Sequence, residues 1–220
     1  VFITEFDFIN DNTGYAGGSD ADYNALIKKT TDGGQSWTTV CDDFPESEYE
    51  LQGISFISEL VGWAVTYNGR VYKTTDGGET WDLLINFSKD SREAVRDIEF
   101  VNTEKGMVIG GIAGCGKIWT TEDGGETWTY HDDLDNANGS SMDELQFLDE
   151  NTCWMVGYGM YSNHSISHSD DFGNTWVGEA ENIDDLEPGN QDGFTSLSMV
   201  NEKLGFFVSN KRPDYEGAVY

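Results

Sequence analysis

The sequence has few cysteines, few prolines and few basic residues, and these shortages exclude several classes of protein. Its 220 residues include three Cys, three Pro and three His, and 12 Lys and Arg stand against 41 Asp and Glu, for a net charge of −29. Nucleic acids and anionic membranes are therefore unfavourable partners, because phosphate contacts require basic side chains. No apolar run approaches the ~20 residues that cross a bilayer as a helix, so no membrane insertion is expected.

The three cysteines, Cys41, Cys115 and Cys153, do not have the spacing of a metal site. Because their number is odd, at least one has no partner within the chain. We interpret them as small buried or turn residues rather than as a redox pair, and their redox state stays open. The sequence begins at Val1 in a strand-like segment, without the basic region or cleavage site of a signal peptide. We expect that any export signal has been removed or lies outside this sequence.

The main positive feature is an eight-residue motif that occurs four times. Hydrophobic residues make up 37% of the chain, with seven Trp, ten Tyr and twelve Phe, which is enough for a core. The motif reads Ser/Thr-x-Asp-x-Gly-x-x-Trp, and its copies occupy residues 30–37, 74–81, 121–128 and 169–176. The four aspartates are 44, 47 and 48 residues apart, a period typical of solenoid and propeller repeats.

Each motif is predicted to form a hairpin turn with a structural role. The Asp carboxylate can accept backbone N–H bonds in the turn, the Gly permits a positive φ, and the Trp offers a large apolar face to a neighbouring sheet. The residues concerned are Asp32, Gly34 and Trp37 in the first copy, Asp76, Gly78 and Trp81 in the second, Asp123, Gly125 and Trp128 in the third, and Asp171, Gly173 and Trp176 in the fourth.

Short strands surround every motif, and they predict an all-β fold. Upstream triplets such as Phe6–Phe8 and Ile54–Phe56 alternate apolar and polar residues, which indicates half-buried strands. A second, almost wholly apolar strand follows each triplet, then a third strand, the motif and a fourth strand. Four antiparallel strands in about 45 residues are typical of a β-propeller blade. The expected blades are 1–43, 48–88, 93–133, 142–180 and a partial fifth at 192–220, which suggests a piece of a larger propeller.

The motifs resemble the Asp-box (BNR) repeats of sialidases, sortilin-type receptors and xyloglucan-type glycoside hydrolases. The longer pattern of residues 54–81 is more similar still to photosystem II assembly factor-like propellers and to secreted bacterial surface proteins built from the same repeat. The resemblance covers nearly the whole chain and implies the fold, export and a structural role for the motif aspartates. It does not imply one activity, because this scaffold hosts enzymes, receptors and assembly factors.

Two kinds of site stay open on the residues alone. Xyloglucan-type hydrolysis needs two carboxylates facing each other across a cleft, and Asp7, Asp97 and Glu99 on the first strands are candidates, with a hydrated channel wall as the plainer interpretation. Residues 132–139 are rich in Asp and Asn, but Leu134 and Leu145 occupy the first and twelfth positions of an EF-hand alignment, so only a looser calcium site remains. We therefore expect no cofactor, with calcium as the possible exception, and the metal is unknown.

The acidic residues concentrate in the connections from each fourth strand to the next blade. The segments 42–50, 87–95, 132–144 and 179–192 hold 18 of the 41 Asp and Glu. Such connections gather on one face of a propeller, so they form either a cation- or partner-binding face or simply solvated loops. The residues that represent this face are Asp42, Asp43, Asp132, Asp133, Asp135, Asp184 and Asp185.

The leading functional hypothesis is a non-catalytic, secreted or cell-surface β-propeller module that binds protein or glycan through this acidic, loop-rich face. The alternative is a glycoside hydrolase of the xyloglucan-active propeller type, and a photosystem assembly role comes third. The remaining blades, or another chain, are expected to complete the propeller. An open arc would expose two apolar sheet faces.

Overall fold

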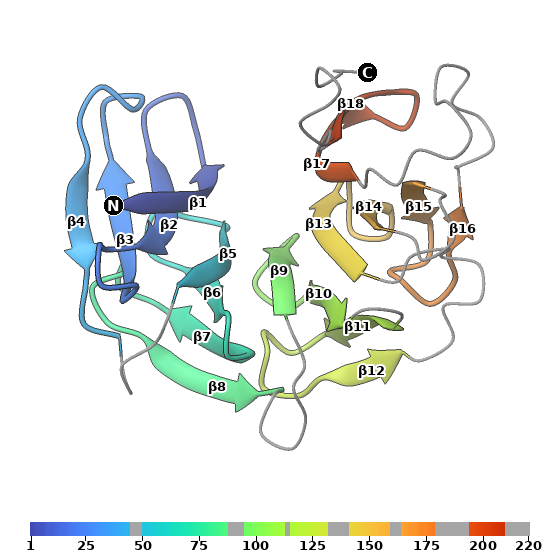
Figure 1. The fold of residues 1–220 in the computed structure, drawn as a ribbon, viewed down its shortest axis with the longest axis horizontal. Helices are drawn as coiled ribbons and strands as arrows, with labels where there is room; N and C mark the ends of the chain where they lie inside the picture. The colour runs from blue at the N-terminus through green and yellow to red at the C-terminus, as the bar shows by residue number, and fades with distance from the viewer. Residues whose placement is uncertain are drawn as a thin grey trace. The chain divides into compact units, whose positions relative to one another are not determined.

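All regular structure in the described part of the chain is β-strand. The computed structural model describes residues 1–44, 50–87, 95–112, 115–131, 141–158, 164–178 and 194–209. Their strands form four antiparallel sheets of four strands and one sheet of two (Figure 1). The prediction of an all-β fold made of four-stranded antiparallel blades is confirmed. Of the partial fifth blade predicted at 192–220, only residues 194–209 are described.

The strands follow one another along the chain within each sheet, so every connection inside a sheet is a hairpin. The first sheet contains β1 (Phe2–Phe8), β2 (Gly14–Ser19), β3 (Ala25–Thr30) and β4 (Thr38–Cys41). The second contains β5 (Leu51–Phe56), β6 (Gly62–Thr66), β7 (Arg70–Thr74) and β8 (Asp82–Asn86).

The other three sheets repeat this order. The third contains β9 (Val95–Phe100), β10 (Gly106–Ile112), β11 (Cys115–Thr121) and β12 (Thr129–His131). The fourth contains β13 (Ser141–Phe147), β14 (Cys153–Tyr158), β15 (His164–Ser169) and β16 (Val177–Gly178). The two-stranded sheet contains β17 (Phe194–Asn201) and β18 (Leu204–Ser209).

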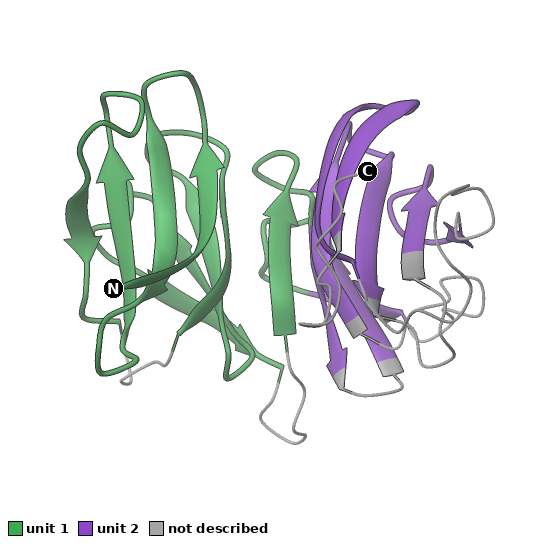
Figure 2. Ribbon diagram, turned by 45° about the horizontal axis from the view of Figure 1, so that its top comes forward, with its two compact units in different colours: residues 1–106, 121–127 green, residues 107–120, 128–220 purple. Residues whose placement is uncertain are grey.

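The chain forms two compact units, which are described separately. Unit 1 comprises residues 1–106 and 121–127, and unit 2 comprises residues 107–120 and 128–220 (Figure 2). Unit 1 thus holds the first two sheets, β9 and the turn of the third motif. Unit 2 holds β10 to β12, the fourth sheet and the described part of the fifth.

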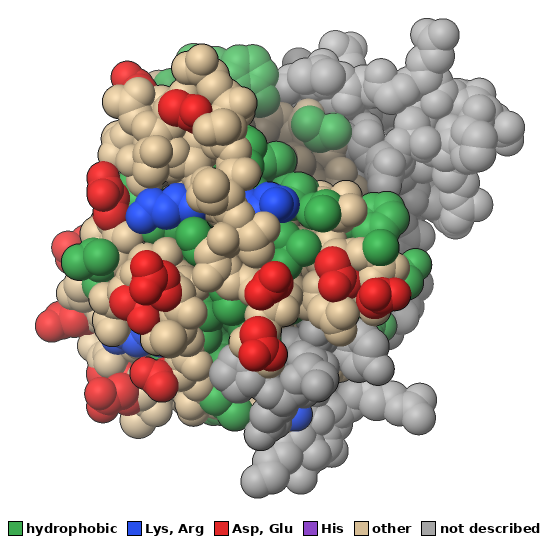
Figure 3. Space-filling view, turned by 90° about the vertical axis from the view of Figure 1, so that its left-hand side faces the viewer, with side chains coloured by type: hydrophobic (Ala, Val, Ile, Leu, Met, Phe, Trp, Pro, Cys, Tyr) green, Lys and Arg blue, Asp and Glu red, His purple; other side chains and the backbone are tan. Residues whose placement is uncertain are grey.

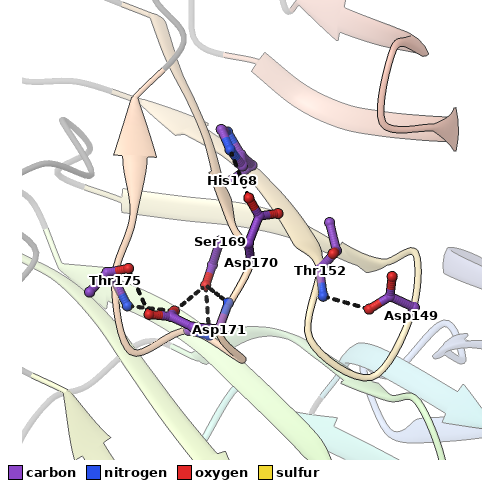
Figure 4. A network of polar contacts seen from close by, with 8 residues as sticks. Asp149, Thr152, His168, Ser169, Asp170, Asp171 and Thr175 are labelled. Atoms are coloured by element: carbon purple, nitrogen blue, oxygen red, sulfur yellow. Dashed lines mark hydrogen bonds and ion pairs between the residues drawn. The ribbon is translucent and has the colours of Figure 1, made fainter.

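The four motifs fold into nearly identical turns after the third strand of each sheet. In the second copy, Asp76 accepts a bond from the Thr80 backbone N–H at 2.9 Å and from the Thr80 hydroxyl at 2.6 Å. The Thr74 hydroxyl donates to Asp76 at 2.8 Å and accepts the Gly78 N–H at 3.0 Å. The same bonds recur around Asp171 in the fourth sheet (Figure 4). The Asp and the initial Ser or Thr together satisfy the polar groups of the turn.

The motif turn also ties two hairpins of one sheet together. The backbone N–H of the motif's fourth residue donates to a carbonyl in the hairpin between the first and second strands, as Gly77 does to Leu60 at 2.9 Å. Gly77 and Gly78 have φ of 80° and 91°. A Cβ on Gly77 would lie 2.7 Å from the Glu59 carbonyl oxygen. The fourth copy places Phe172 in the equivalent position with φ of 58°, so this copy accepts backbone strain that glycine avoids.

Neighbouring sheets in unit 1 pack through an aromatic contact that repeats. Tyr15 on β2 stacks on Phe56 of β5 with ring centroids 3.5 Å apart and planes 2° apart. Trp63 on β6 stacks in the same way on Phe100 of β9, at 3.6 Å and 4°. The second strand of one sheet therefore covers the end of the first strand of the next. Tyr15, Trp63 and Phe56 are almost completely buried, and such stacking adds to the free energy of area burial.

Polar side chains also form hydrogen bonds between the first strand of one sheet and backbone groups in the first strand of the next. Thr4 on β1 donates to the Leu51 carbonyl of β5 at 2.9 Å, and Asp7 accepts the Phe56 N–H near the other end of both strands. The hydroxyl of Ser55 accepts the Phe100 N–H at 2.9 Å. In unit 2, Gln146 on β13 accepts the Met199 N–H of β17 at 2.5 Å. β1 and β5 consequently run side by side in the same direction.

The prediction for the fold concerns the left-handed glycine of the second motif. Gly78→Ala places a Cβ at a φ of 91°, so we expect it to lower the free energy of unfolding by about 1–2 kcal/mol. Glu79→Ala in the same turn is the control, because an exposed substitution changes stability by about 0.5 kcal/mol or less. Urea unfolding of both variants is the measurement. Equal stabilities of the two variants would contradict the assigned turn.

Candidate functional site

The carboxylates of the motif aspartates form hydrogen bonds within their own turns. The hydroxyl and backbone N–H of Ser36 lower the pKa of Asp32 to about 2, and Thr80 and Thr127 do the same for Asp76 and Asp123. The indole N–H groups of Trp37, Trp81 and Trp176 donate to the glycine carbonyl three residues earlier, at 3.0–3.2 Å. With their oxygens occupied in this way, these carboxylates act as turn-forming groups.

Of the three first-strand carboxylates considered for hydrolysis, Asp7, Asp97 and Glu99, the first two accept hydrogen bonds from backbone N–H groups. Asp7 accepts the Phe56 N–H, and burial raises its pKa to about 6. Asp97 is 3% exposed and accepts its neighbour's N–H, from Ile98, at 2.7 Å. In unit 2, Glu144 accepts the Leu197 N–H at 3.2 Å, and burial raises its pKa as well. Each of these carboxylates therefore binds a backbone N–H on its own strand or on a neighbouring strand. None of these contacts places two carboxylates opposite each other across a cleft.

Exposed acidic and aromatic residues gather at one end of the first two sheets. In each antiparallel sheet, the turn between the second and third strands lies at the same end as the start of the first strand and the end of the fourth. We call this surface of unit 1 the acidic–aromatic end. It consists of Phe2, Asp20, Asp22, Tyr23, Asp42, Asp43, Glu50 and Tyr67.

Aromatic rings project from this end, whereas the motif turns lie at the opposite end of each sheet. Tyr23 and Tyr67 are 59% and 55% exposed, and the Phe2 ring stacks on Tyr23 with centroids 6.4 Å apart. The Tyr67 N–H donates to the Glu50 carbonyl at 3.0 Å, which fixes the second turn beside the start of β5. Figure 3 shows one face of the molecule, on which acidic, basic and hydrophobic side chains are interspersed.

The turn that carries Tyr23 is held rigidly. One oxygen of Asp20 accepts the N–H groups of Asp22 and Asn24 at 2.8 and 2.9 Å, and the other accepts the Asn24 amide at 3.0 Å. The Asn24 side chain and backbone lower the pKa of Asp20. Tyr23 itself has φ of 66°, which is rare for a bulky residue. This aromatic turn was not predicted from the sequence, although its Asp-x-Asp-x-Asn pattern is a signal for an Asx turn.

The predicted acidic face falls only partly within the described residues. Asp42 and Asp43 follow β4 and are exposed at the acidic–aromatic end. Arg70 and Arg96 lie near the start of β7 and β9 at the same end, so the charge there is biased to negative rather than purely negative. The other representatives of this face, Asp132, Asp133, Asp135, Asp184 and Asp185, lie outside the described residues.

The described ranges contain no group of three or more His, Cys, Asp or Glu side chains arranged to hold a metal. The predicted calcium loop at 132–139 lies outside those ranges, so that prediction stays open. Cys41 and Cys153 are buried thiols, and the side chain of Cys115 is outside the described part. His168 stacks on Trp154 with centroids 4.9 Å apart and lies 3.8 Å from Asp170. No helix in the described ranges is long and apolar enough to span a membrane.

The first part of the chain matches the model of one protein family. Residues 1–90 match the family model described as photosynthesis system II assembly factor YCF48. This match covers less than half of the chain, and the fold of the described sheets is that of a β-propeller. No curated protein matches this propeller. The matched segment contains the first two motif turns and the Tyr15–Phe56 contact between their sheets.

Solved structures similar to the propeller show the fold. YCF48 bound to D1 peptide is 18% identical, with a TM-score of 0.50 over 95% of this chain and 90% of that one. YCF48 from Cyanidioschyzon merolae is 15% identical, with a TM-score of 0.63 over 94% of this chain and 63% of that one. The GH74 xyloglucanase from Xanthomonas campestris is 12% identical, with a TM-score of 0.66 over 99% of this chain and 36% of that one. The propeller therefore spans less than two thirds of the last two proteins.

The prediction for this region concerns the pH dependence of stability. The pKa of Asp7 is raised from 3.8 to about 6 by burial, so the protonated form stabilises the fold below pH ~4, and this contribution is lost as the pH rises through 6. Asp7→Asn keeps an acceptor oxygen without the charge. We expect it to raise the free energy of unfolding at pH 7.5 by at most about 3 kcal/mol, and to have little effect at pH 4.

The control variant is Asp76→Asn, which is expected to lower the free energy of unfolding rather than raise it. The pKa of Asp76 is lowered to about 2 by bonds from Thr80, so its charged form stabilises the fold at all pH values above 4, and the contribution is lost as the pH falls through 2. Asp76→Asn should therefore destabilise the protein equally at pH 5 and pH 7.5. Urea unfolding at pH 4, 5 and 7.5 measures both variants. A constant effect of Asp7→Asn across this range would show that the Asp7 carboxylate is not desolvated.

Proposed function

We propose that this propeller is a non-catalytic binding module that recognises a basic protein segment through its acidic–aromatic end. The observation that carries the proposal is the difference between the two ends of the first two sheets. At one end, the motif carboxylates are saturated by turn hydrogen bonds. At the other, Tyr23 and Tyr67 are exposed beside Asp22, Asp42 and Asp43, whose side chains face solvent.

The chemistry of this end suits a basic segment of a protein. Tyrosine rings offer a large contact area at a low cost in side-chain entropy, and their faces attract Lys and Arg. Carboxylates beside the rings favour encounter with a positively charged segment and disfavour an acidic one. The bonds from Asp20 hold the Tyr23 turn before any partner binds, which lowers the entropic cost of association.

A solved relative supports a protein ligand over a glycan. The YCF48 structure of similar fold was determined with a D1 peptide bound, so a propeller of this kind can hold a peptide. The likeness to the xyloglucanase concerns the fold, and the first-strand carboxylates Asp7 and Asp97 are engaged with backbone N–H groups. We place the module outside the cell or at its surface, a proposal supported by the resemblance of its repeats to secreted bacterial proteins.

A peptide-binding experiment tests this proposal. The probes are three fluorescent twelve-residue peptides of equal length, with alternating Lys and Leu, Ser and Leu, or Glu and Leu. We expect binding of the Lys peptide alone, weakening as NaCl rises from 50 to 300 mM because exposed charges are screened. The variant Tyr23→Ala/Tyr67→Ala should weaken binding of the Lys peptide at least tenfold, because it removes the aromatic contact without changing the charge.

The control for aromatic loss is Tyr130→Ala. Tyr130 is 47% exposed on β12 in unit 2, outside the acidic–aromatic end, so its removal should leave peptide affinity unchanged. Equal affinities of the double variant and wild type would show that the Lys peptide binds the overall negative charge, and would refute this surface. Release of reducing ends from xyloglucan by the wild-type protein would instead support the hydrolase alternative.

Calcium binding by the acidic connections is a separate proposal, supported by the density of carboxylates in the sequence. Eighteen acidic residues in four connections repel one another, and calcium accepts six to eight oxygens in irregular geometry. At a hundred times its Kd, the ion would stabilise the fold by about 2.7 kcal/mol. We expect 2 mM CaCl2 to raise the Tm more than NaCl of matched ionic strength. Equal shifts would indicate screening alone.

A further inference from the structure

The two exposed tyrosines of the acidic–aromatic end belong to neighbouring sheets, one on each side of the seam between the first sheet and the second. Tyr23 is in the turn between β2 and β3, and Tyr67 is in the turn between β6 and β7. The two sheets pack against each other along this seam, where Tyr15 of β2 stacks on Phe56 of β5. A ligand that contacts both tyrosine rings must therefore cross from one sheet to the other.

The seam contains two unsatisfied hydroxyl groups at this end. Ser19 ends β2 and Thr66 ends β6, both side chains are fully buried, and neither hydroxyl has a hydrogen-bond partner among the described residues. Both face the seam, because their cross-strand neighbours, Ala25 and Leu51, belong to the core cluster between the two sheets. Buried hydroxyls without a partner are unfavourable. A ligand that crosses the seam can supply the missing partner, directly or through a water.

Each tyrosine has an acidic residue beside it. Asp22 precedes Tyr23 in its turn and is exposed, and the Glu50 carbonyl accepts the Tyr67 N–H at 3.0 Å. A basic side chain at either place is attracted by the face of the ring and by the carboxylate. The second turn is also fixed, because the Gly69 N–H donates to the Thr66 carbonyl at 2.8 Å. The two sheets thus present two subsites for basic side chains at a fixed separation.

The separation of the subsites selects the conformation of the ligand. Packed sheets lie about 10 Å apart. In a polyproline II helix, residues i and i+3 are on the same side and about 9 Å apart. In a β-strand, residues on the same side are about 7 Å apart at i and i+2, or about 13 Å at i and i+4. An α-helix reaches about 10.5 Å at i and i+7, but a short isolated helix is marginal in water. Polyproline II therefore fits best.

We propose that the partner crosses this seam as a polyproline II segment with two basic residues three positions apart, one over Tyr23 and the other over Tyr67. The inference rests on the proposed function, because it specifies the basic segment that the acidic–aromatic end recognises. Once the first basic residue is bound, binding of the second is intramolecular, which raises the affinity without any further contact. A segment with the same two charges on different sides engages one subsite at a time.

Three fluorescent polyproline peptides of equal length, each with two lysines, test the spacing. The lysines are two, three or four positions apart, so only the i,i+3 peptide presents both on one side. We expect this peptide to bind at least tenfold more tightly than the other two in fluorescence anisotropy. Tyr23→Ala and Tyr67→Ala, each alone, should reduce its affinity to that of the other peptides. Tyr67→Phe is the matched control, because it keeps the ring and should keep the preference.

Equal affinities of the three peptides overturn the inference, as does binding of none of them, or a preference for i,i+3 that survives Tyr67→Ala. The alternating Lys and Leu peptide distinguishes these results from failure of the proposed function. If that peptide binds and its affinity depends on Tyr23 and Tyr67, while the polyproline peptides do not differ, the binding surface is correct and only the spacing is wrong. If it does not bind either, both proposals are wrong.

Discussion

The structure depends on the contact between the first strand of a sheet and the sheet that precedes it. A four-stranded meander has two faces and cannot bury both alone, so each sheet needs a neighbour. Here the neighbour supplies a flat ring over the end of the first strand and a side-chain acceptor for its backbone N–H. Tyr15 and Asp7 both act on Phe56 in this way. Apolar burial and backbone satisfaction are thus achieved by the same pair of strands.

The sequence predicts the repeat well because its signals are local. An Asp, two positions with positive φ and a Trp define a turn within eight residues, and period-2 alternation defines the strands. Contacts between sheets are harder to predict, because Asp7 and Phe56 are far apart in the chain and nothing in either triplet indicates that one binds the other. Asp7, Asp97 and Glu99 were candidates for a hydrolytic site. Asp97 accepts the N–H of the next residue, Ile98, whereas the partner of Asp7, the Phe56 N–H, lies on another strand and became visible only when the strands were placed side by side.

In the first two sheets, the stabilising motif turns and the proposed binding surface lie at opposite ends. Every motif turn lies at one end of its sheet, where hydroxyl and carboxylate groups satisfy one another. The opposite end carries connections whose length and charge vary from repeat to repeat, and there the sequence is free of the turn's constraints. Tyr23 illustrates the difference, because a bulky residue with φ of 66° has a steric cost in a turn of this size. That cost is offset by the bonds from Asp20, and the result is a ring fixed in solvent.

Amide-resolved hydrogen exchange at low micromolar concentration tests the central claim most directly. Phe8, Phe56 and Phe100 occupy equivalent positions at the ends of β1, β5 and β9. The N–H groups of Phe56 and Phe100 donate to Asp7 and Ser55 of the preceding sheet, whereas Phe8 has no preceding sheet among the described residues and is 47% exposed. The account predicts strong protection at Phe56 and Phe100 and at least a hundredfold faster exchange at Phe8. Equal exchange rates at Phe8 and Phe56 would contradict it.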